Sequence, residues 1–587
     1  MKRATIRKML VTCISAIIVF AFSCKKKEEV AVQEPEPQQE EITMEEKMNR
    51  SFEEFLSFYI AEVKKLDKEE SLAAWQAYTE GKDEHYKAME EAAIKKKTYH
   101  SDSEKYKQLK EIKKSGAIVD PLLKRQLDII HNDFLANQLP PDLMEKMVKL
   151  STEIEKTFNT ARGVVDDKEY SRNDVVEVLK NSKDNKLRRK VWEAHKEVGV
   201  KVADKLVELI KLRNEAAKQL GFENYREMQL ILQDYDPEAL NSIFKELAEK
   251  TQEPFTTYKA ELDEKLAKNL KIKKTDDLRP WHYADPFFQD APQFTKIDFD
   301  KYFQDKDLVE IAASYFKSFG LDIAPVLDRS DLFPKKGKSE HAFCFTIDRD
   351  EPDVRVLCNI VPNASWMDTL LHELGHGLYD SYYTEDMPWR LREPAHIFTT
   401  EGIAQLFGEM SKNPYWLKEM IGLSDKEVKK IKEQVLKQKA LGRLIFARWS
   451  LVMYHFEKSL YEDPDQDLTA LWWGLVEKYQ QVKRPEGREK PDWATKDHIV
   501  AAPVYYHNYV LGQMFQDQLQ EKAAGLAGET DPLKVIFKDK PELGTFLIDN
   551  VFKPGATRPW PEFVEASTGK PLGVDSYIGS LTWGMEE

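Results

Sequence analysis

The sequence has no excess of positive charge. Its 88 lysines and arginines are outnumbered by 102 aspartates and glutamates, which gives a net charge of −14. Proteins that bind nucleic acid neutralise phosphates with basic patches, so this acidic chain is not expected to bind DNA or RNA. The acidic balance favours solubility instead.

Long apolar runs are also rare. The one clear run, residues 9–22, follows a basic N-terminus and is too short to span a bilayer comfortably. A basic start followed by a short apolar run is typical of a secretory signal peptide. No later stretch has 18 or more apolar residues in a row, so the rest of the chain is expected to be soluble.

The apolar run ends at a cysteine, in Ala21-Phe22-Ser23-Cys24, which resembles a bacterial lipoprotein signal. We therefore expect residues 1–23 to be removed as a signal peptide and Cys24 to be lipidated. Residues 24–44, rich in Glu, Gln, Pro and Lys, are expected to form a flexible tether. The predicted location is the bacterial cell envelope, periplasmic or surface, with the membrane contacted only through the lipid. The alternative is an ordinary signal peptide and secretion.

Cysteine and glycine are both scarce, at 4 and 24 residues. Beyond Cys24 only Cys344 and Cys358 remain, in two strand-like runs that flank an acidic turn. They could form a disulfide across a hairpin in an oxidising compartment, or stay as two buried thiols.

With little glycine and long stretches rich in Glu, Lys, Leu and Ala, the composition favours helices. Over residues 45–270, apolar side chains recur at spacings near 3.6, as in Phe52, Phe55 and Tyr59. Strand-like runs are confined to residues 341–347 and 354–361. Because no linker-like stretch interrupts residues 45–587, we predict a single, mainly α domain with one small antiparallel sheet.

Residues 365–380 contain a metal-binding pattern. His372 and His376 lie four positions apart in a segment with an apolar helical face, so one side of a helix can aim both imidazoles at one ion. Glu373 follows the first histidine, where it can hydrogen-bond water at that ion and act as the general base.

A third ligand distinguishes a metal site from two chance histidines. Glu401 lies 25 residues beyond His376, on a second apolar helical segment. Its carboxylate would complete a His₂Glu set with the fourth position open, which is the arrangement of a catalytic zinc. One zinc per chain is therefore predicted; it would polarise a peptide carbonyl while Glu373 moves the proton from water to the leaving amine.

With these residues in place, the sequence resembles the angiotensin-converting-enzyme (peptidyl-dipeptidase A) family of gluzincin metallopeptidases, and more distantly the thimet-type oligopeptidases. The resemblance is densest over residues 340–520. It implies a large helical ellipsoid of two lobes around a deep active-site groove, with the small sheet beside the metal helix. It also implies cleavage of short peptides, with release of C-terminal dipeptides as the leading activity.

Two further motifs carry the resemblance. His341-Ala342 precedes the metal helix as the family's edge strand does, which implies that both residues bind the substrate backbone. Lys496-Asp-His498 resembles the family's Lys-x-His motif. It implies that Lys496 binds the substrate's C-terminal carboxylate and that His498 holds the peptide and its transition state.

Tyr506 and Tyr509 resemble the family's Tyr-x-x-Tyr segment. It implies that one tyrosine stabilises the oxyanion and the other helps to bind the carboxylate end. The pair is displaced by one residue relative to the family, so Tyr505 is an alternative for the first role. The family's chloride-binding arginine is replaced by His507 or Asn508, so chloride activation is not predicted. The family's glutamine that assists the lysine cannot be placed in the sequence.

Together these features predict a zinc metallopeptidase that acts as a monomer on short peptides. Peptidyl-dipeptidase activity is the leading prediction. An oligoendopeptidase of the same fold is the alternative, and it would have no need of Lys496. An alternative of another class is a lipoprotein that binds peptides without cleaving them.

Overall fold

The computed structural model describes residues 43–292 and 297–585. The signal peptide, Cys24 and most of the tether predicted over residues 24–44 lie outside these residues, so they stay predictions. The first helix already begins at Met44, where Thr43 and Glu46 form a reciprocal capping box. Within the described residues, no helix combines the length and hydrophobicity that crossing a bilayer requires.

The fold is mainly α-helical, which confirms the predicted fold class. The α-helices of the first half are α1 (Met44–Glu80), α2 (Asp83–His100), α3 (Ser103–Ser115), α4 (Pro121–Leu135), α5 (Pro141–Thr160), α6 (Arg172–Asn181), α7 (Asn185–Gln219), α8 (Tyr225–Leu232) and α9 (Pro237–Asn269). Those of the second half are α10 (Leu308–Ser318), α11 (Ala324–Arg329), α12 (Ala364–Ser381), α13 (Ile397–Gly408), α14 (Pro414–Trp416), α15 (Asp425–Glu462), α16 (Leu468–Gln480), α17 (His498–Ala501), α18 (His507–Ala527), α19 (Pro541–Leu547), α20 (Trp560–Thr568) and α21 (Asp575–Ser580).

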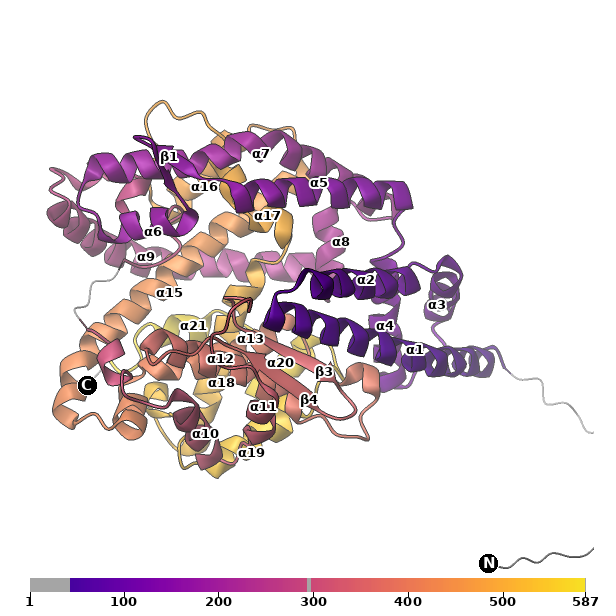
Figure 1. The fold of residues 1–587 in the computed structure, drawn as a ribbon. Coiled ribbons are helices and arrows are strands. Elements are labelled where there is room, and N and C mark those ends of the chain that lie inside the picture. The colour runs from indigo at the N-terminus through magenta and orange to yellow at the C-terminus, as the bar shows by residue number, and fades with distance from the viewer. Residues whose placement is uncertain (1–42, 293–296, 586–587) are drawn as a thin grey trace, which may run out of the picture.

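Beyond α4, most of the helices form two groups (Figure 1). One group holds α5 to α9 with α16 and α17, and the other holds α10 to α14 with α18 to α21. The long helix α15 joins them, because it packs against α9 and α16 in the first group and against α14 and α18 in the second. A cavity of about 1350 Å³ lies between the groups, lined by residues of α6, α9, α15 and α18.

Two hairpins form the only sheets among the described residues. β3 (Phe343–Asp348) pairs antiparallel with β4 (Asp353–Leu357), which is the predicted sheet with shorter strands. β4 ends at Leu357 because Cys358 and Ile360 donate their N–H groups to the carbonyls of residues 331 and 332 instead. The second hairpin, β1 (Gly163–Val165) with β2 (Lys168–Tyr170), was not predicted, since three-residue strands show no usable alternation.

The register of the larger hairpin separates the two cysteines. Cys344 lies opposite Val356, while Cys358 follows the end of β4. Both are free thiols, and Cys358 is fully buried. Of the two alternatives left open by the sequence, the structure has the pair of unbridged thiols.

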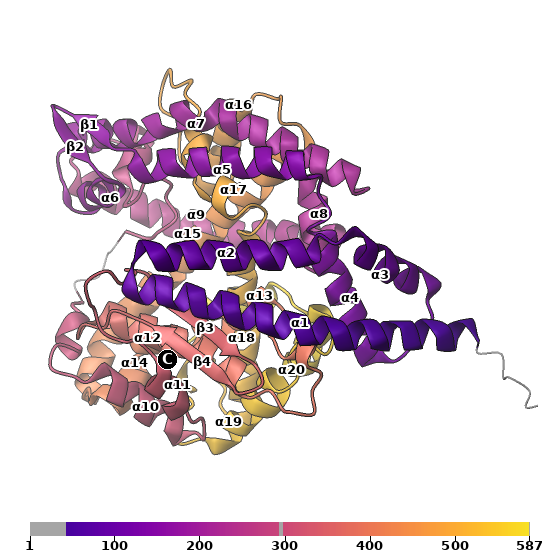
Figure 2. The ribbon, with the colours of Figure 1, turned by 45° about the vertical axis from the view of Figure 1, so that its right-hand side comes forward.

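Helices α1 and α2 form an antiparallel pair that lies across the β3–β4 hairpin (Figure 2). Lys64 and Lys68 of α1 form 2.6 Å ion pairs with Asp350 and Asp348 at the hairpin turn. Near the other end of α1, Trp75 packs edge-on against Phe345 of β3. Charged and apolar contacts together therefore hold the helix pair over the sheet.

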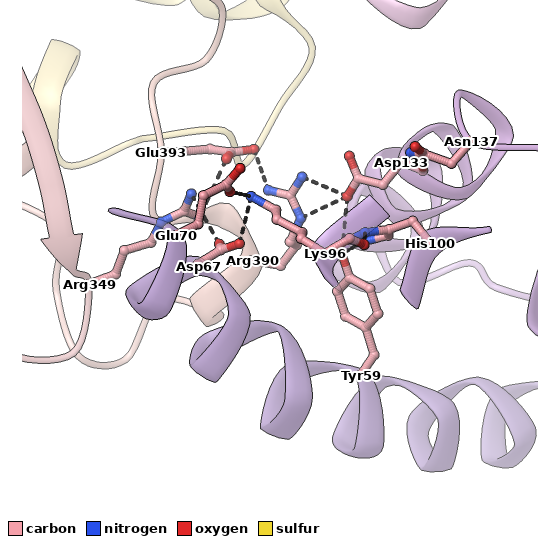
Figure 3. A network of polar contacts seen from close by, with 10 residues as sticks. All are labelled: Tyr59, Asp67, Glu70, Lys96, His100, Asp133, Asn137, Arg349, Arg390 and Glu393. Atoms are coloured by element: carbon pink, nitrogen blue, oxygen red, sulfur yellow. Dashed lines mark hydrogen bonds and ion pairs between the residues drawn. The ribbon is translucent and has the colours of Figure 1, made fainter. Parts of the chain in front are cut away.

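A network of charged side chains extends this attachment (Figure 3). Arg390, in the 3₁₀ helix η4 (Trp389–Leu391), bonds Asp133 of α4 at 2.8 Å and also pairs with Glu393. Arg349, beyond β3, contacts Glu393 at 3.4 Å, and Lys96 of α2 joins two carboxylates of α1 at 2.8 Å each. The network thus ties α1, α2 and α4 to the segment that leads into α13.

Candidate active site

Helix α12 presents the two histidines of the metal pattern. Its N-cap is Asn363, whose side-chain oxygen accepts the N–H of Trp366 at 2.8 Å. The leucines of its apolar face are buried, which fixes the rotation of the helix. His372 and His376 consequently lie on one side, with ring centroids 5.0 Å apart.

Helix α13 brings Glu401 to the same point. Its carboxylate oxygens lie 3.9 Å from Nε2 of His372 and 3.6 Å from Nε2 of His376. The close approach of the two helices depends on Gly375, because a Cβ atom there would lie 2.9 Å from the Cα of Ala404. The sequence prediction that these three residues come together therefore agrees with the geometry.

The three residues fit a divalent metal ion. One donor atom from each lies within 4.8 Å of the others, and a single ion with ligand distances of about 2 Å can bridge such a set. The Nδ1 atom of His376 is 2.7 Å from Oγ1 of Thr400, and a neutral ring that donates its Nδ1–H to this oxygen has the Nε2 lone pair available for the metal. Burial, and then the neighbouring His372, lower the pKa of His376 to about 3, which keeps the ring neutral.

Two residues that contact the metal ligands were not predicted from the sequence. Thr400 holds His376, and the amide nitrogen of Gln405 donates to Glu401 at 3.3 Å. Asp380, one turn beyond His376, accepts hydrogen bonds from Thr346 and Tyr383 and bonds none of the three metal-ligand residues. No pattern in the sequence marks Thr400, because its contact with His376 depends on how α12 and α13 cross.

Glu373 points away from solvent beside the metal ligands, and its side chain is only 8% exposed. Burial raises the pKa of its carboxyl group to about 8, and the nearby charge of Glu401 adds to the effect. A carboxyl group in such surroundings is ready to accept a proton once a positive ion is present.

Lys496 lies at the centre of a second polar cluster. Its side chain is 1% exposed, and its Nζ atom donates to Oε1 of Gln289 at 3.1 Å. The Tyr506 hydroxyl lies 3.5 Å from the same oxygen and accepts a 2.6 Å hydrogen bond from Trp449. Among the described residues Gln289 is the one acceptor that Nζ reaches, so two of its N–H donors remain for a ligand.

Gln289 was not predicted from the sequence, in which no glutamine could be placed beside Lys496. The loop that carries it is organised by the buried carboxylate of Asp285, which accepts the N–H groups of Phe287, Gln289 and Asp290 at 2.8 to 3.2 Å. No local pattern marks Gln289, because its partner Lys496 lies 207 residues further along the chain.

The remaining predicted side chains connect the two clusters. His498 has its ring centroid 5.1 Å from Tyr506 and 6.4 Å from Tyr509. Tyr509 stacks edge-on with Tyr506 at 5.3 Å and with Tyr505 at 5.4 Å. Burial raises the pKa of Tyr509, and the charges of Glu401 and Asp497 raise it further.

Of the three tyrosines, Tyr506 is the one that contacts Lys496 and Gln289. Burial, and then the charges of Tyr509 and Glu401, raise the pKa of Tyr505. The sequence could not separate Tyr505 from Tyr506, and the geometry places Tyr506 at the lysine.

His341 and Ala342 lie immediately before β3 and not within it. His341 is exposed, and its ring centroid is 6.3 Å from that of Phe343. The expectation of a strand over residues 341–347 is therefore wrong for its first two residues. They form an irregular end of the hairpin, and their predicted role in binding peptide backbone stays a prediction.

The chain matches known proteins along most of its length. A family model described as angiotensin-converting enzyme matches residues 46–573. The angiotensin-converting enzyme of Oryctolagus cuniculus is 27% identical over 276 residues, 45% of this chain and 21% of that protein. The chain thus spans about a fifth of the length of that curated relative.

Two other relatives align over larger shares of their own length. The angiotensin-converting enzyme of Haematobia irritans exigua is 26% identical over 285 residues, 45% of each chain. The angiotensin-converting enzyme-like protein Ace3 of Mus musculus is 23% identical over 482 residues, 76% of this chain and 64% of that protein. Because the family model covers most of the sequence, the chain belongs to the angiotensin-converting-enzyme family of zinc-dependent metallopeptidases.

Proposed function

We propose that this protein is a zinc peptidyl-dipeptidase, which releases dipeptides from the C-terminal end of short peptides. The observation that carries the proposal is the convergence of Lys496, Gln289 and Tyr506 beside the row of side chains that leads to the candidate metal ligands. A buried ammonium group with two N–H donors to spare suits a carboxylate ligand.

The two clusters are connected through contacting tyrosine rings. Tyr506, beside Lys496, has its ring centroid 5.3 Å from that of Tyr509, whose pKa is raised by burial and by the charge of Glu401. Two residues of extended peptide span about 7 Å. In the proposed binding mode the terminal carboxylate of the peptide bonds Lys496, and the penultimate peptide bond lies at Glu373 and the metal ligands.

His372, His376 and Glu401 would hold one zinc ion, which supplies a Lewis acid for the scissile carbonyl. Glu373 accepts a proton from the attacking water and delivers it to the leaving nitrogen as the carbon–nitrogen bond breaks. His498 and Tyr509 donate hydrogen bonds to the oxygen on which negative charge develops.

Product analysis of one unstructured decapeptide tests the proposal. The peptide is offered with a free and with an amidated C-terminus to zinc-loaded wild type and to Glu373→Gln, and the products are identified by mass spectrometry. We expect stepwise loss of dipeptides from the free acid, much slower turnover of the amidated peptide, and no products from the variant. Elemental analysis should find one zinc per chain in both proteins.

Other products would redirect the function. Internal cuts that are indifferent to the amide would make the enzyme an oligoendopeptidase. An absence of cleavage, by zinc-loaded protein and across a panel of peptides, would contradict peptidase activity and favour a peptide-binding protein.

A further inference from the structure

The turn between α17 and α18 contains a strained residue. Among the described residues, Val504 is the one β-branched residue with a positive φ angle, at 54°. Valine is disfavoured in this left-handed region because its branched Cβ crowds the backbone. Val504 is 2% exposed and immediately precedes Tyr505 and Tyr506. Such a conformation persists only where surrounding contacts hold it, and strained residues of this kind concentrate at functional sites.

Both backbone groups of Val504 are bonded by side chains from outside the turn. Its N–H group donates to Oε1 of Glu457, on α15, at 2.9 Å. Its carbonyl oxygen accepts from Nε2 of Gln233, at the end of α8, at 3.2 Å. Glu457 is 5% exposed, so little water competes for the first bond. A carboxyl oxygen accepts hydrogen bonds whether or not the group is ionised, so this contact does not depend on the charge of Glu457.

Gln233 is itself held by its neighbours. Its Oε1 atom accepts from Nδ2 of Asn508 at 3.2 Å, and Oδ1 of Asn508 accepts from the Tyr235 hydroxyl group at 2.6 Å. This order of donors and acceptors leaves Nε2 of Gln233 as the group that faces Val504. The backbone carbonyl of Gln233 accepts from Nε2 of His396 at 2.8 Å. The side chain therefore extends to the turn from a fixed backbone.

Helix α15 holds Tyr506 at two points. Glu457 bonds the backbone two residues before the tyrosine. Trp449, about two helical turns earlier on α15, donates a 2.6 Å hydrogen bond to the tyrosine hydroxyl. The ring lies 5.3 Å from Nζ of Lys496, and the hydroxyl lies 3.5 Å from Oε1 of Gln289. Because Tyr506 precedes the first residue of α18, the turn sets its direction.

We propose that Glu457 and Gln233 are positioning residues for the cluster around Lys496. They hold Val504 in its left-handed conformation, and the turn in that conformation places Tyr506 beside Lys496. The inference rests on the proposed function, in which this cluster binds the C-terminal end of a peptide. Both residues act through the backbone of the turn and not through contact with the peptide.

The proposal predicts different effects on two kinetic parameters. Tyr509 lies inside α18, which packs against α13, so it should keep its place when the turn relaxes. Tyr506 precedes the helix and should move away from Lys496. Loss of either hydrogen bond to Val504 should therefore raise KM for free-acid peptides, while kcat and the zinc content stay near those of wild type.

Steady-state kinetics with the free-acid and amidated decapeptides tests this difference. Glu457→Met, which removes the acceptor, should raise KM for the free-acid peptide about tenfold and change KM for the amide little. Glu457→Gln keeps an acceptor and should restore most of the loss. Gln233→Met, at a half-buried residue, should raise the same KM about threefold. Glu462→Met, at an exposed residue of α15, is the control and should leave KM unchanged.

Glycine at residue 504 distinguishes positioning from a general structural role. Glycine adopts a φ angle of 54° without strain, so the turn then needs less support from its neighbours. In the Val504→Gly background, Glu457→Met should therefore raise KM for the free-acid peptide only about twofold. Lys271→Gly removes the strain of a φ angle of 56° at an exposed residue after α9, and it should give no such rescue.

A crystal structure of Glu457→Met provides a readout that needs no activity. We expect φ at residue 504 to become negative and the Tyr506 hydroxyl to move away from Gln289. An unchanged turn, an unchanged KM, or an equal rise of KM in the Val504→Gly background would overturn the inference. If the turn changes as expected but wild type cleaves no peptide, the positioning of Tyr506 stands and the proposed peptidase function fails.

Discussion

The Nδ1 atom of His376 lies 2.7 Å from the hydroxyl oxygen of Thr400, the residue that precedes Glu401 in α13. One helix therefore provides both a candidate metal ligand and the group that orients a ligand on the neighbouring helix. Thr400 is buried, so water does not compete for its hydroxyl.

Replacing Thr400 by valine should weaken zinc binding while preserving the shape of the side chain. Without the hydroxyl group, nothing fixes the orientation of the His376 ring, and such partners are worth about 10- to 100-fold in metal affinity. Competition with a fluorescent chelator measures the affinity. Thr400→Ser keeps the acceptor and should remain near wild type; equal affinities for valine and threonine would refute the role.

Gly375→Ala should damage both stability and metal binding. The new methyl group would meet the backbone of Ala404 at 2.9 Å, so α12 and α13 must separate. Overpacking of this kind costs about 1–3 kcal/mol, measured by denaturant unfolding, and zinc affinity should fall in parallel. Gly474→Ala, in α16 with no neighbouring atom within 4 Å, is the matched control and should be neutral or stabilising. A stable Gly375→Ala protein with unchanged zinc affinity would contradict the packing argument.

Lys496→Met should raise KM for free-acid peptides by about 10- to 100-fold, because a charge-assisted bond to the carboxylate is lost. Gln289→Leu should do the same to a smaller extent. Amidated peptides, which have no terminal charge, serve as the internal control and should be turned over as before. Equal losses on both kinds of peptide would mean that Lys496 has a structural role.

The preference for a free C-terminus should depend on pH. Burial lowers the pKa of Lys496 to about 8, partly offset by the charge of Asp497. Below that value Lys496 is charged and can bind a carboxylate, and above it the lysine loses its proton. The ratio of kcat/KM for free-acid over amidated peptide should therefore be flat below pH 8 and fall towards about tenfold per unit above it. A ratio that stays constant to pH 10 would exclude this assignment.

Arg390→Ala should destabilise the protein by about 3 kcal/mol, since Asp133 and Glu393 would lose their buried partner. Figure 3 shows that this arginine lies between Asp133 and Glu393 in the network that ties α1 and α2 to the rest of the fold, so proteolysis of that helix pair should accelerate. Lys437→Ala, which breaks an exposed pair with Glu433, is the control and should leave unfolding unchanged. Similar unfolding of both variants would show that the network contributes little.

The metal ligands could be predicted because their pattern is local. His372 and His376 are one helical turn apart, and Glu401 belongs to a second apolar helix that the spacing alone reveals. The orienting role of Thr400 depends instead on how α12 and α13 cross. The crossing depends on the close packing of Gly375 against Ala404, and a single sequence does not show which residues of two helices meet.

The polar cluster around Lys496 could be predicted only in part. Lys496 stands in a recognisable motif, but Gln289 reaches it across 207 residues through a loop without regular structure. The same holds for Arg390 and Asp133, which are 257 residues apart. Contacts of this range depend on the arrangement of the two groups of helices, and periodicity within a segment carries no information about that arrangement.

The loop anchored by Asp285 lowers the entropic cost of binding a ligand. Because a single carboxylate accepts the backbone N–H groups of Phe287, Gln289 and Asp290, the conformational entropy of the loop is lost when the chain folds and not when a peptide binds. A preorganised binding site discriminates between ligands by how well they fit it, and it tolerates little displacement of its own side chains. One residue inserted between Asp285 and Gln289 should therefore abolish the distinction between acid and amide while leaving hydrolysis itself intact.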